Sequence, residues 1–104
     1  MSKFDEREKG FEKKFIRDEE LQFKVNAKRN KYLGEWAAEK LGKLDTDKEE
    51  YVQEVIKSDF AEPGDEDVFR KIQGDFKKAS ISISDSEIRK QMSTLLERAK
   101  KDFL

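Results

Sequence analysis

The hydrophobic positions of this chain recur at helical spacing along most of its length. Between residues 18 and 41 two apolar stripes lie on nearly opposite faces of one predicted helix, and Gly42 follows where helices commonly end. A helix that is apolar on two sides is expected to be central and to pack against more than one neighbour. The stripes are Leu21, Val25, Tyr32 and Trp36 on one face, and Phe23, Ala27, Gly34, Ala38 and Leu41 on the other.

Start signals predict three further helices. Thr46 with Glu49, and Ser84 with Glu87, have the spacing of a capping box, in which each end of the motif satisfies a free backbone N–H. The acidic residues 65–67 suit the positive N-terminal end of a helix that follows a break at Pro63-Gly64. The apolar stripes of these helices are Tyr51, Val52, Val55, Ile56 and Phe60, then Val68, Phe69, Ile72, Phe76 and Ala79, then Ile88, Met92, Leu95, Leu96, Ala99 and Phe103.

The segment between the last two helices alternates serine and isoleucine from Ser80 to Ser84. This alternation is typical of a strand, but the chain offers no partner strand, so we interpret the segment as an extended connection. Ile83 and Ile88 flank the predicted cap as a hydrophobic staple. Short connections between four helices indicate an all-α, antiparallel-type four-helix bundle over residues 18–104.

Residues 1–17, called the arm below, have a different pattern. Phe4, Phe11 and Phe15 are separated by steps of seven and four, which would bring their rings onto one narrow stripe of a helix. The residues between the rings are charged apart from Gly10, so the arm has too little apolar surface to fold alone. It is expected to be flexible when free and to become helical in a groove. A membrane-surface helix is disfavoured because its carboxylates would be repelled by anionic lipid.

From the residues alone, the arm either seeks a partner or folds back onto the bundle as an N-terminal extension. The basic collar formed by Lys28, Arg29, Asn30 and Lys31 also has two interpretations. It is either solvated surface or a docking patch for an acidic partner, in which case Lys28, Arg29 and Lys31 would carry the contact.

Composition places the chain close to the limit of foldability. It has 104 residues, of which 35% are hydrophobic and 45% charged, with a mean hydropathy of -1.01. Eight Phe, one Trp and two Tyr supply large buried areas, so a single small domain with a marginal core is expected. The net charge of -1 hides an acidic surplus in residues 43–67 between two basic segments. Such blocks suit helices that attract one another and do not indicate a nucleic-acid partner.

The residue types needed for most site chemistry are missing. The chain has no Cys and no His, which removes thiolate chemistry and the commonest general base and metal ligand. The acidic run 62–67 lacks the spacing of an EF-hand loop, and the isolated glycines form no phosphate-binding loop. We therefore expect no enzyme activity, cofactor or metal. No apolar run is long enough to span a membrane, so a cytoplasmic protein that does not insert in the membrane is expected.

Four stretches of the chain resemble one known family. They are FEKKFIRDEELQFK from Phe11, KRNKYLGEWAAEKLG from Lys28, YVQEVIKSDFAEPGDEDVFRKI from Tyr51 and ISDSEIRKQM from Ile83. These stretches are similar to the alphaproteobacterial zeta subunit, a natural inhibitor of the F-type ATP synthase. The likeness covers nearly the whole chain in order and requires no gap that would remove an element.

The resemblance implies a mechanism as well as a fold. In that family a four-helix bundle carries an inhibitory arm that inserts as a helix between catalytic alpha and beta subunits and reaches the gamma shaft, which blocks rotation in the hydrolytic direction. The protein would be a monomer when free and would reach the cytoplasmic face of the inner membrane through the synthase. The arm residues expected to contact it are Phe4, Asp5, Arg7, Glu8, Phe11, Lys14, Phe15 and Arg17. The alternative is a non-enzymatic helical regulatory or adaptor module, with or without weak nucleotide binding.

Overall fold

Four α-helices make up the part of the chain that the computed structural model describes, which is residues 19–60 and 64–103. They are α2 (Glu19–Lys40), α3 (Asp45–Ser58), α4 (Glu66–Lys78) and α5 (Asp85–Lys101). Their order and approximate bounds agree with the four predicted helices, and the all-α fold class is confirmed. Residues 1–18, which include the arm, and Pro63 lie outside the described residues.

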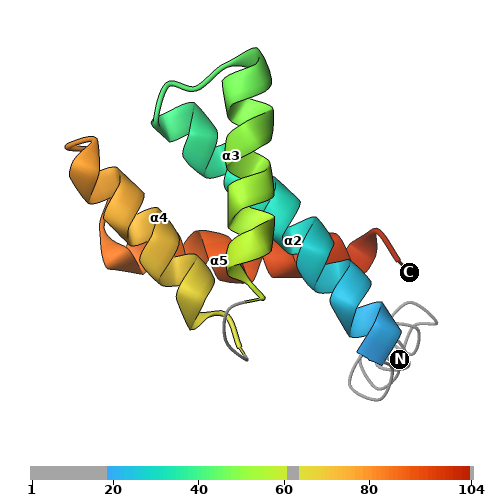
Figure 1. Cartoon of the computed structure of the whole chain (residues 1–104). Coiled ribbons are helices and arrows are strands. Elements are labelled where there is room, and N and C mark those ends of the chain that lie inside the picture. The colour runs from blue at the N-terminus through green and yellow to red at the C-terminus, as the bar shows by residue number, and fades with distance from the viewer. Residues whose placement is uncertain (1–18, 61–63, 104) are drawn as a thin grey trace.

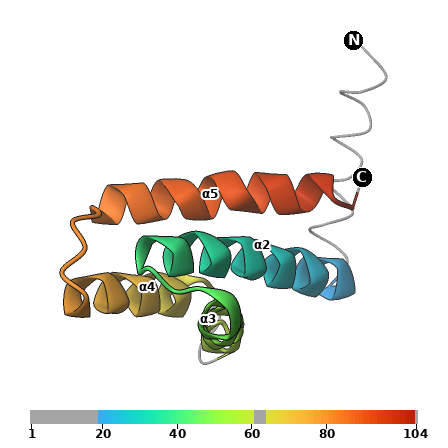
Figure 2. The ribbon, with the colours of Figure 1, turned by 90° about the horizontal axis from the view of Figure 1, so that it is seen from above.

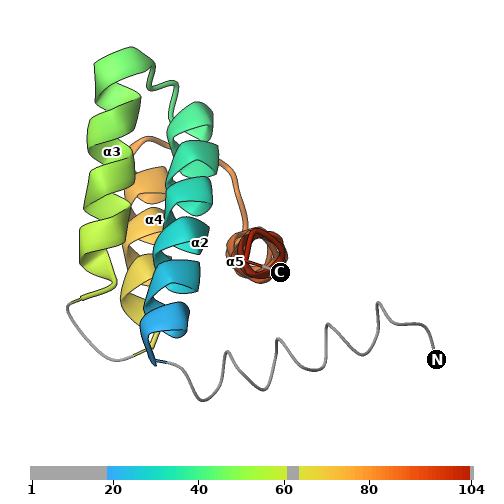
Figure 3. The ribbon, with the colours of Figure 1, turned by 90° about the vertical axis from the view of Figure 1, so that its right-hand side faces the viewer.

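Three of the helices run up, down and up, and the fourth crosses them. In Figure 3, α2, α3 and α4 stand upright while α5 is seen end-on. Figure 1 shows the same helix running behind the other three, and Figure 2 places it on one side of α2 with α3 and α4 on the other. The extended segment between Ala79 and Ser84 allows this change of direction, because extended backbone covers more distance per residue than helix. The arrangement is therefore less regular than an antiparallel bundle.

The central position predicted for α2 is confirmed. Gly34 faces α3 so closely that a Cβ atom there would lie 3.0 Å from the Cα atom of Val52. On the other side, the Trp36 ring meets the ring of Phe76 of α4 edge to face, with centroids 5.6 Å apart. The Tyr32 hydroxyl donates to Asp102, which follows α5. Both apolar faces of α2 therefore have a neighbouring helix.

The hydrophobic core is built from one stripe of each helix. Four of the five predicted positions of α4 and four of the six of α5 are buried, as are the first three of α3. Ala79 and Phe103, the last position of each stripe, are exposed. Ile81 and Ile83 of the extended connection pack against this cluster. The buried residues of the main cluster are Leu33, Ala37, Ala38, Tyr51, Val55, Val68, Phe69, Ile72, Phe76, Ile88, Met92 and Leu95.

Two helices end in the same hydrogen-bonded motif. After α2, Gly42 has a φ of 75°, and the Lys43 N–H donates to the Ala38 carbonyl at 2.9 Å. After α4, Ser80 has a φ of 57°, and the Ile81 N–H donates to the Phe76 carbonyl at 2.8 Å. These are Schellman motifs, which place one residue in the left-handed region. The sequence indicates only the first, because serine is not a usual residue for that conformation.

One predicted N-cap is correct and the other is wrong. Ser84 caps α5 by accepting a hydrogen bond from the Glu87 N–H at 3.1 Å, although the Glu87 carboxylate accepts from Gln91. Thr46 does not cap α3, because the helix begins at Asp45 after an N-cap at Leu44 that makes no side-chain bond. The Leu44 carbonyl already accepts from the Asp47 N–H at 3.1 Å, which places Thr46 inside the first turn.

Candidate functional site

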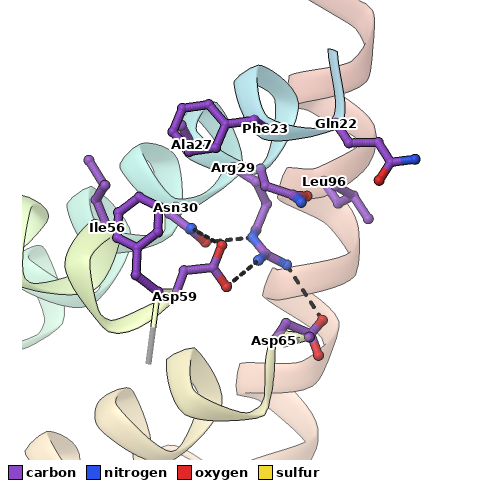
Figure 4. Close-up of a pocket in the computed structure, with 12 residues that line it drawn as sticks. Gln22, Phe23, Ala27, Arg29, Asn30, Ile56, Asp59, Asp65 and Leu96 are labelled. Atoms are coloured by element: carbon purple, nitrogen blue, oxygen red, sulfur yellow. Dashed lines mark hydrogen bonds and ion pairs between the residues drawn. The ribbon is translucent and has the colours of Figure 1, made fainter. Parts of the chain in front are cut away.

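The eight predicted arm contacts lie outside the described residues, so the structure reports on the surface next to the arm. The described chain begins at Glu19, and the first turns of α2 lead to a cleft of about 580 Å³. Figure 4 shows this cleft between the first half of α2, the end of α3 and one side of α5. Phe23, Ala27 and Ile56 are among its lining residues, and Leu96 contributes from α5.

The predicted basic collar is not a single surface. Arg29 and Asn30 are 2% and 1% exposed. Lys28 is half-buried and its ammonium lies 5.6 Å from the centre of the Tyr32 ring. Lys31 is exposed and borders a second cleft, whose eleven lining residues include four carboxylates of α2 and α3. Arg29 is therefore not part of a solvated surface, while a docking role for Lys28, Arg29 and Lys31 stays a prediction.

A buried polar network explains why Arg29 lies inside. Its Nε donates to the Asn30 Oδ1 at 2.7 Å, and the Asn30 Nδ2 donates to the Asp59 Oδ2 at 3.0 Å. The two terminal guanidinium nitrogens lie 4.0 Å from Asp59 and 3.6 Å from Asp65. Figure 4 shows these four residues together in the lining of the cleft.

The network joins the middle of α2 to the end of α3 and the start of α4. Asp59 is the C-cap residue of α3 and Asp65 is the N-cap residue of α4. A buried guanidinium needs compensation for the water that it loses, and two carboxylates and an amide provide it here. Arg29 therefore fixes the positions at which α3 ends and α4 begins relative to α2.

A helical signal for this burial is present in the sequence. Arg29 stands four residues after Val25 and four before Leu33, both of which are fully buried, so all three share one stripe of α2. Grouping residues 28–31 by adjacency hides this relation, because neighbours in sequence point to different sides of a helix.

The cleft is bordered by two aromatic rings that the sequence pattern assigns to apolar stripes. Phe23 and Phe60 are 56% and 62% exposed. Their rings stack with centroids 5.9 Å apart. Phe60 lies past the end of α3 at Ser58, where the helical register that predicted its burial no longer applies.

A second polar cluster covers the side of α2 that faces α5. The Arg98 guanidinium lies 3.9 Å from the centre of the Tyr32 ring. The hydrogen bond to Asp102 raises the pKa of the Tyr32 hydroxyl, with a smaller contribution from burial. Long-range partners of this kind leave no local pattern, and the sequence does not indicate them.

The described residues contain no group of three or more His, Cys, Asp or Glu side chains that could hold a metal ion. In the cleft beside α2 the charged groups are paired with one another. Among the described helices, none is both long and apolar enough to cross a membrane. The fold and the site thus define a small all-α protein. Its buried charged residues connect helices, and its cleft is bordered by an exposed pair of aromatic rings.

Comparison with known proteins gives the family. The family model described as ATPase inhibitor subunit zeta matches residues 1–102, so the chain belongs to this family of inhibitor subunits. A solved solution NMR structure is similar, with 41% sequence identity and a TM-score of 0.71, over 80% of this chain and 94% of that one. No curated protein matches the chain. Family membership supports a regulatory role at the ATP synthase.

Proposed function

We propose that this protein inhibits ATP hydrolysis by the F-type ATP synthase. Its arm would insert as a helix at a catalytic alpha/beta interface, reach gamma and block rotation in the hydrolytic direction. The observation that carries this proposal is the extent of the family match, which includes the arm as well as the bundle. The four described helices support it, because within residues 19–60 and 64–103 they share a hydrophobic cluster to which each of them contributes.

The dimensions of the arm are compatible with insertion. A helix over residues 3–17 would be about 22 Å long at 1.5 Å per residue, which is enough to cross a cleft between subunits. Phe4, Phe11 and Phe15 would lie on one side of it and could enter an apolar groove.

The three rings cannot supply the affinity alone. Full burial of a Phe side chain contributes about 1.5–3 kcal/mol. Ordering each backbone residue costs about 1–2 kcal/mol. Helical hydrogen bonds, charge pairs and further buried surface must therefore contribute. Arg7, Lys14 and Arg17 are candidates for pairing with carboxylates of the synthase, as are Lys9 and Lys13, while Asp5 and Glu8 would pair with basic groups.

The absence of histidine constrains regulation of this inhibitor. With no His in the chain, a histidine-based pH switch is not available to it. Rotation of the synthase in the synthetic direction would tend to expel the arm, so ATP synthesis would be largely spared.

No feature of the cleft favours the alternative of an adaptor that binds nucleotide. Arg29 is the one basic residue among those that line the cleft, and its guanidinium is already paired with Asp59 and Asp65. A phosphate group there would meet two carboxylates. The adaptor alternative therefore gains no support from the geometry.

The test is to add the purified full chain to the soluble catalytic head of the cognate ATP synthase and to follow ATP hydrolysis. Hydrolysis is expected to fall to a small fraction of its starting rate. An unchanged rate at micromolar protein would contradict the proposal and would favour the adaptor alternative.

A further inference from the structure

Two of the most exposed large apolar side chains of the described residues lie together. Phe23 of α2 and Phe60, which follows α3, are each more than half exposed, and they stack on one another. Leu44 and Phe103 are the other exposed large apolar residues in the described ranges, and neither stacks with an aromatic ring of another described residue. Folding alone does not account for an aromatic pair in water, because most of its apolar area stays unburied.

The surroundings of this pair are suited to an uncharged apolar group. Ala27, Ile56 and Leu96 line the cleft beside it, and Gln22 and Asn26 add neutral polar groups. Arg29, Asp59 and Asp65 also line the cleft, where their charges are paired with one another. We call the two rings with Ala27 and Ile56 the Phe23–Phe60 patch.

The position of the patch suggests what covers it. Phe23 lies four residues after Glu19, about 6 Å along the helix from the point where the described chain begins. A protein that binds the arm therefore lies close to this end of the bundle. We infer that the Phe23–Phe60 patch is a second contact surface for the ATP synthase, against an apolar area of the catalytic head beside the cleft that takes the arm. This inference rests on the proposed function.

Other occupants fit the same features less well. An arm inserted in the synthase cannot cover the patch at the same time, so the patch is free when the bundle meets the enzyme. A second copy of the chain would bury too little on two rings, because stable interfaces between proteins bury about 1,200 Å² or more. Contact with the synthase also supplies the buried surface that the three arm rings lack.

The test compares the full chain with a Phe23→Ala/Phe60→Ala double variant, using inhibition of the soluble catalytic head as the readout. The double variant is expected to need roughly tenfold more protein for half inhibition, which is the usual scale of a small aromatic hot spot. Leu44→Ala is the matched control, because Leu44 is 73% exposed in the connection at the opposite end of α2. It should change potency less than twofold.

Thermal unfolding of each variant accompanies the assay. If the double variant is unfolded, Asn26→Lys replaces it, since this change adds a charge at the edge of the cleft without removing a ring. Asn26→Lys is then expected to lower potency by the same order, and unchanged potency of this folded variant would contradict the inference.

The possible outcomes separate the two proposals. Inhibition by the natural chain with unchanged potency of the double variant would overturn the second contact surface and leave the proposed function in place. No inhibition by the natural chain would overturn the proposed function itself. A gain of potency in the double variant would show that the patch holds the chain's own arm. A dimer of the natural chain that the double variant lacks would show that a second copy covers it. Either result would contradict the inference.

Discussion

The two halves of α2 are stabilised in different ways. In the second half, Leu33, Ala37 and Ala38 are buried in a continuous apolar core, and Gly34 allows close approach to α3. In the first half, the buried residues include Arg29 and Asn30, and Phe23 is left exposed. The second half holds the fold together through its buried apolar residues, while the half next to the arm combines a polar network with an unburied aromatic pair.

This difference indicates that the two halves of α2 have different roles, one in positioning and one in stability. Buried ion pairs contribute less net stability than apolar residues of the same volume, but they fix the positions of the groups that they join. Here the network fixes the end of α3, from which Phe60 emerges, and the start of α4. The network in the first half of α2 thus fixes the position of a surface, and the apolar core in the second half supplies the stability of the fold.

The largest effect on stability is expected at the contact between α2 and α3. Gly34→Leu should lower the free energy of unfolding by about 2–3 kcal/mol, because the side chain would overlap the backbone of Val52. Gly74→Leu is the matched control in α4, where a Cβ atom would meet nothing within 4 Å. It should raise stability by up to about 1 kcal/mol through helix propensity. Urea unfolding measures both, and equal effects would show that the second half of α2 is not tightly packed.

A smaller loss is expected from the polar network. Arg29→Met should lower the free energy of unfolding by about 2 kcal/mol, less than the usual 3–5 kcal/mol for a broken buried pair because Asp65 is half exposed and water can solvate it. Lys31→Met is the control on the exposed face of the same helix and should stay within about 0.5 kcal/mol. If urea unfolding shows Lys31→Met to be as damaging as Arg29→Met, the network does not organise the first half of α2.

The smallest effect concerns alkaline pH. Burial, followed by the hydrogen bond that the Tyr51 hydroxyl donates to Asp75 at 2.9 Å, raises the pKa of Tyr51 well above its ordinary value of 10.0. Unfolded Tyr51 would ionise above that pH while the folded residue stays protonated, so stability should fall as the pH rises past 10.

Tyr51→Phe tests this origin of the alkaline loss. The variant should cost about 1 kcal/mol at neutral pH through its missing hydrogen bond. It should also show a weaker fall of stability above pH 10 in urea unfolding followed at a series of pH values. An identical alkaline slope in both proteins would mean that other groups are responsible.

Local signals predicted much of the fold. The apolar stripes of α4 and α5, the C-terminal Gly42 and the Ser84 cap depend on residues within two turns of each other, and all were recoverable from spacing. The crossing of α5 depends on tertiary packing, which spacing does not encode. Thr46 was misassigned because a helix can begin at any residue whose carbonyl accepts the first bond, with or without a capping side chain.

The candidate site was less predictable for the same reason. The burial of Arg29 requires Asp59 and Asp65, which are 30 and 36 residues away in sequence and meet it only in the folded protein. The exposure of Phe60 depends on α3 ending two residues earlier. The arm was indicated by the stripe of three rings and by the family resemblance, whereas the Phe23–Phe60 patch became visible only from the folded arrangement.

The central claim is that the arm inhibits and the bundle folds without it. The direct test deletes residues 2–17 and measures both ATP hydrolysis by the catalytic head and thermal unfolding, with Phe11→Ala and Phe15→Ala as milder variants. The deletion should abolish inhibition while unfolding stays cooperative, and the single variants should weaken inhibition with little change in melting temperature. Retained inhibition by the shortened protein, or a fall of many degrees in its melting temperature, would contradict the account.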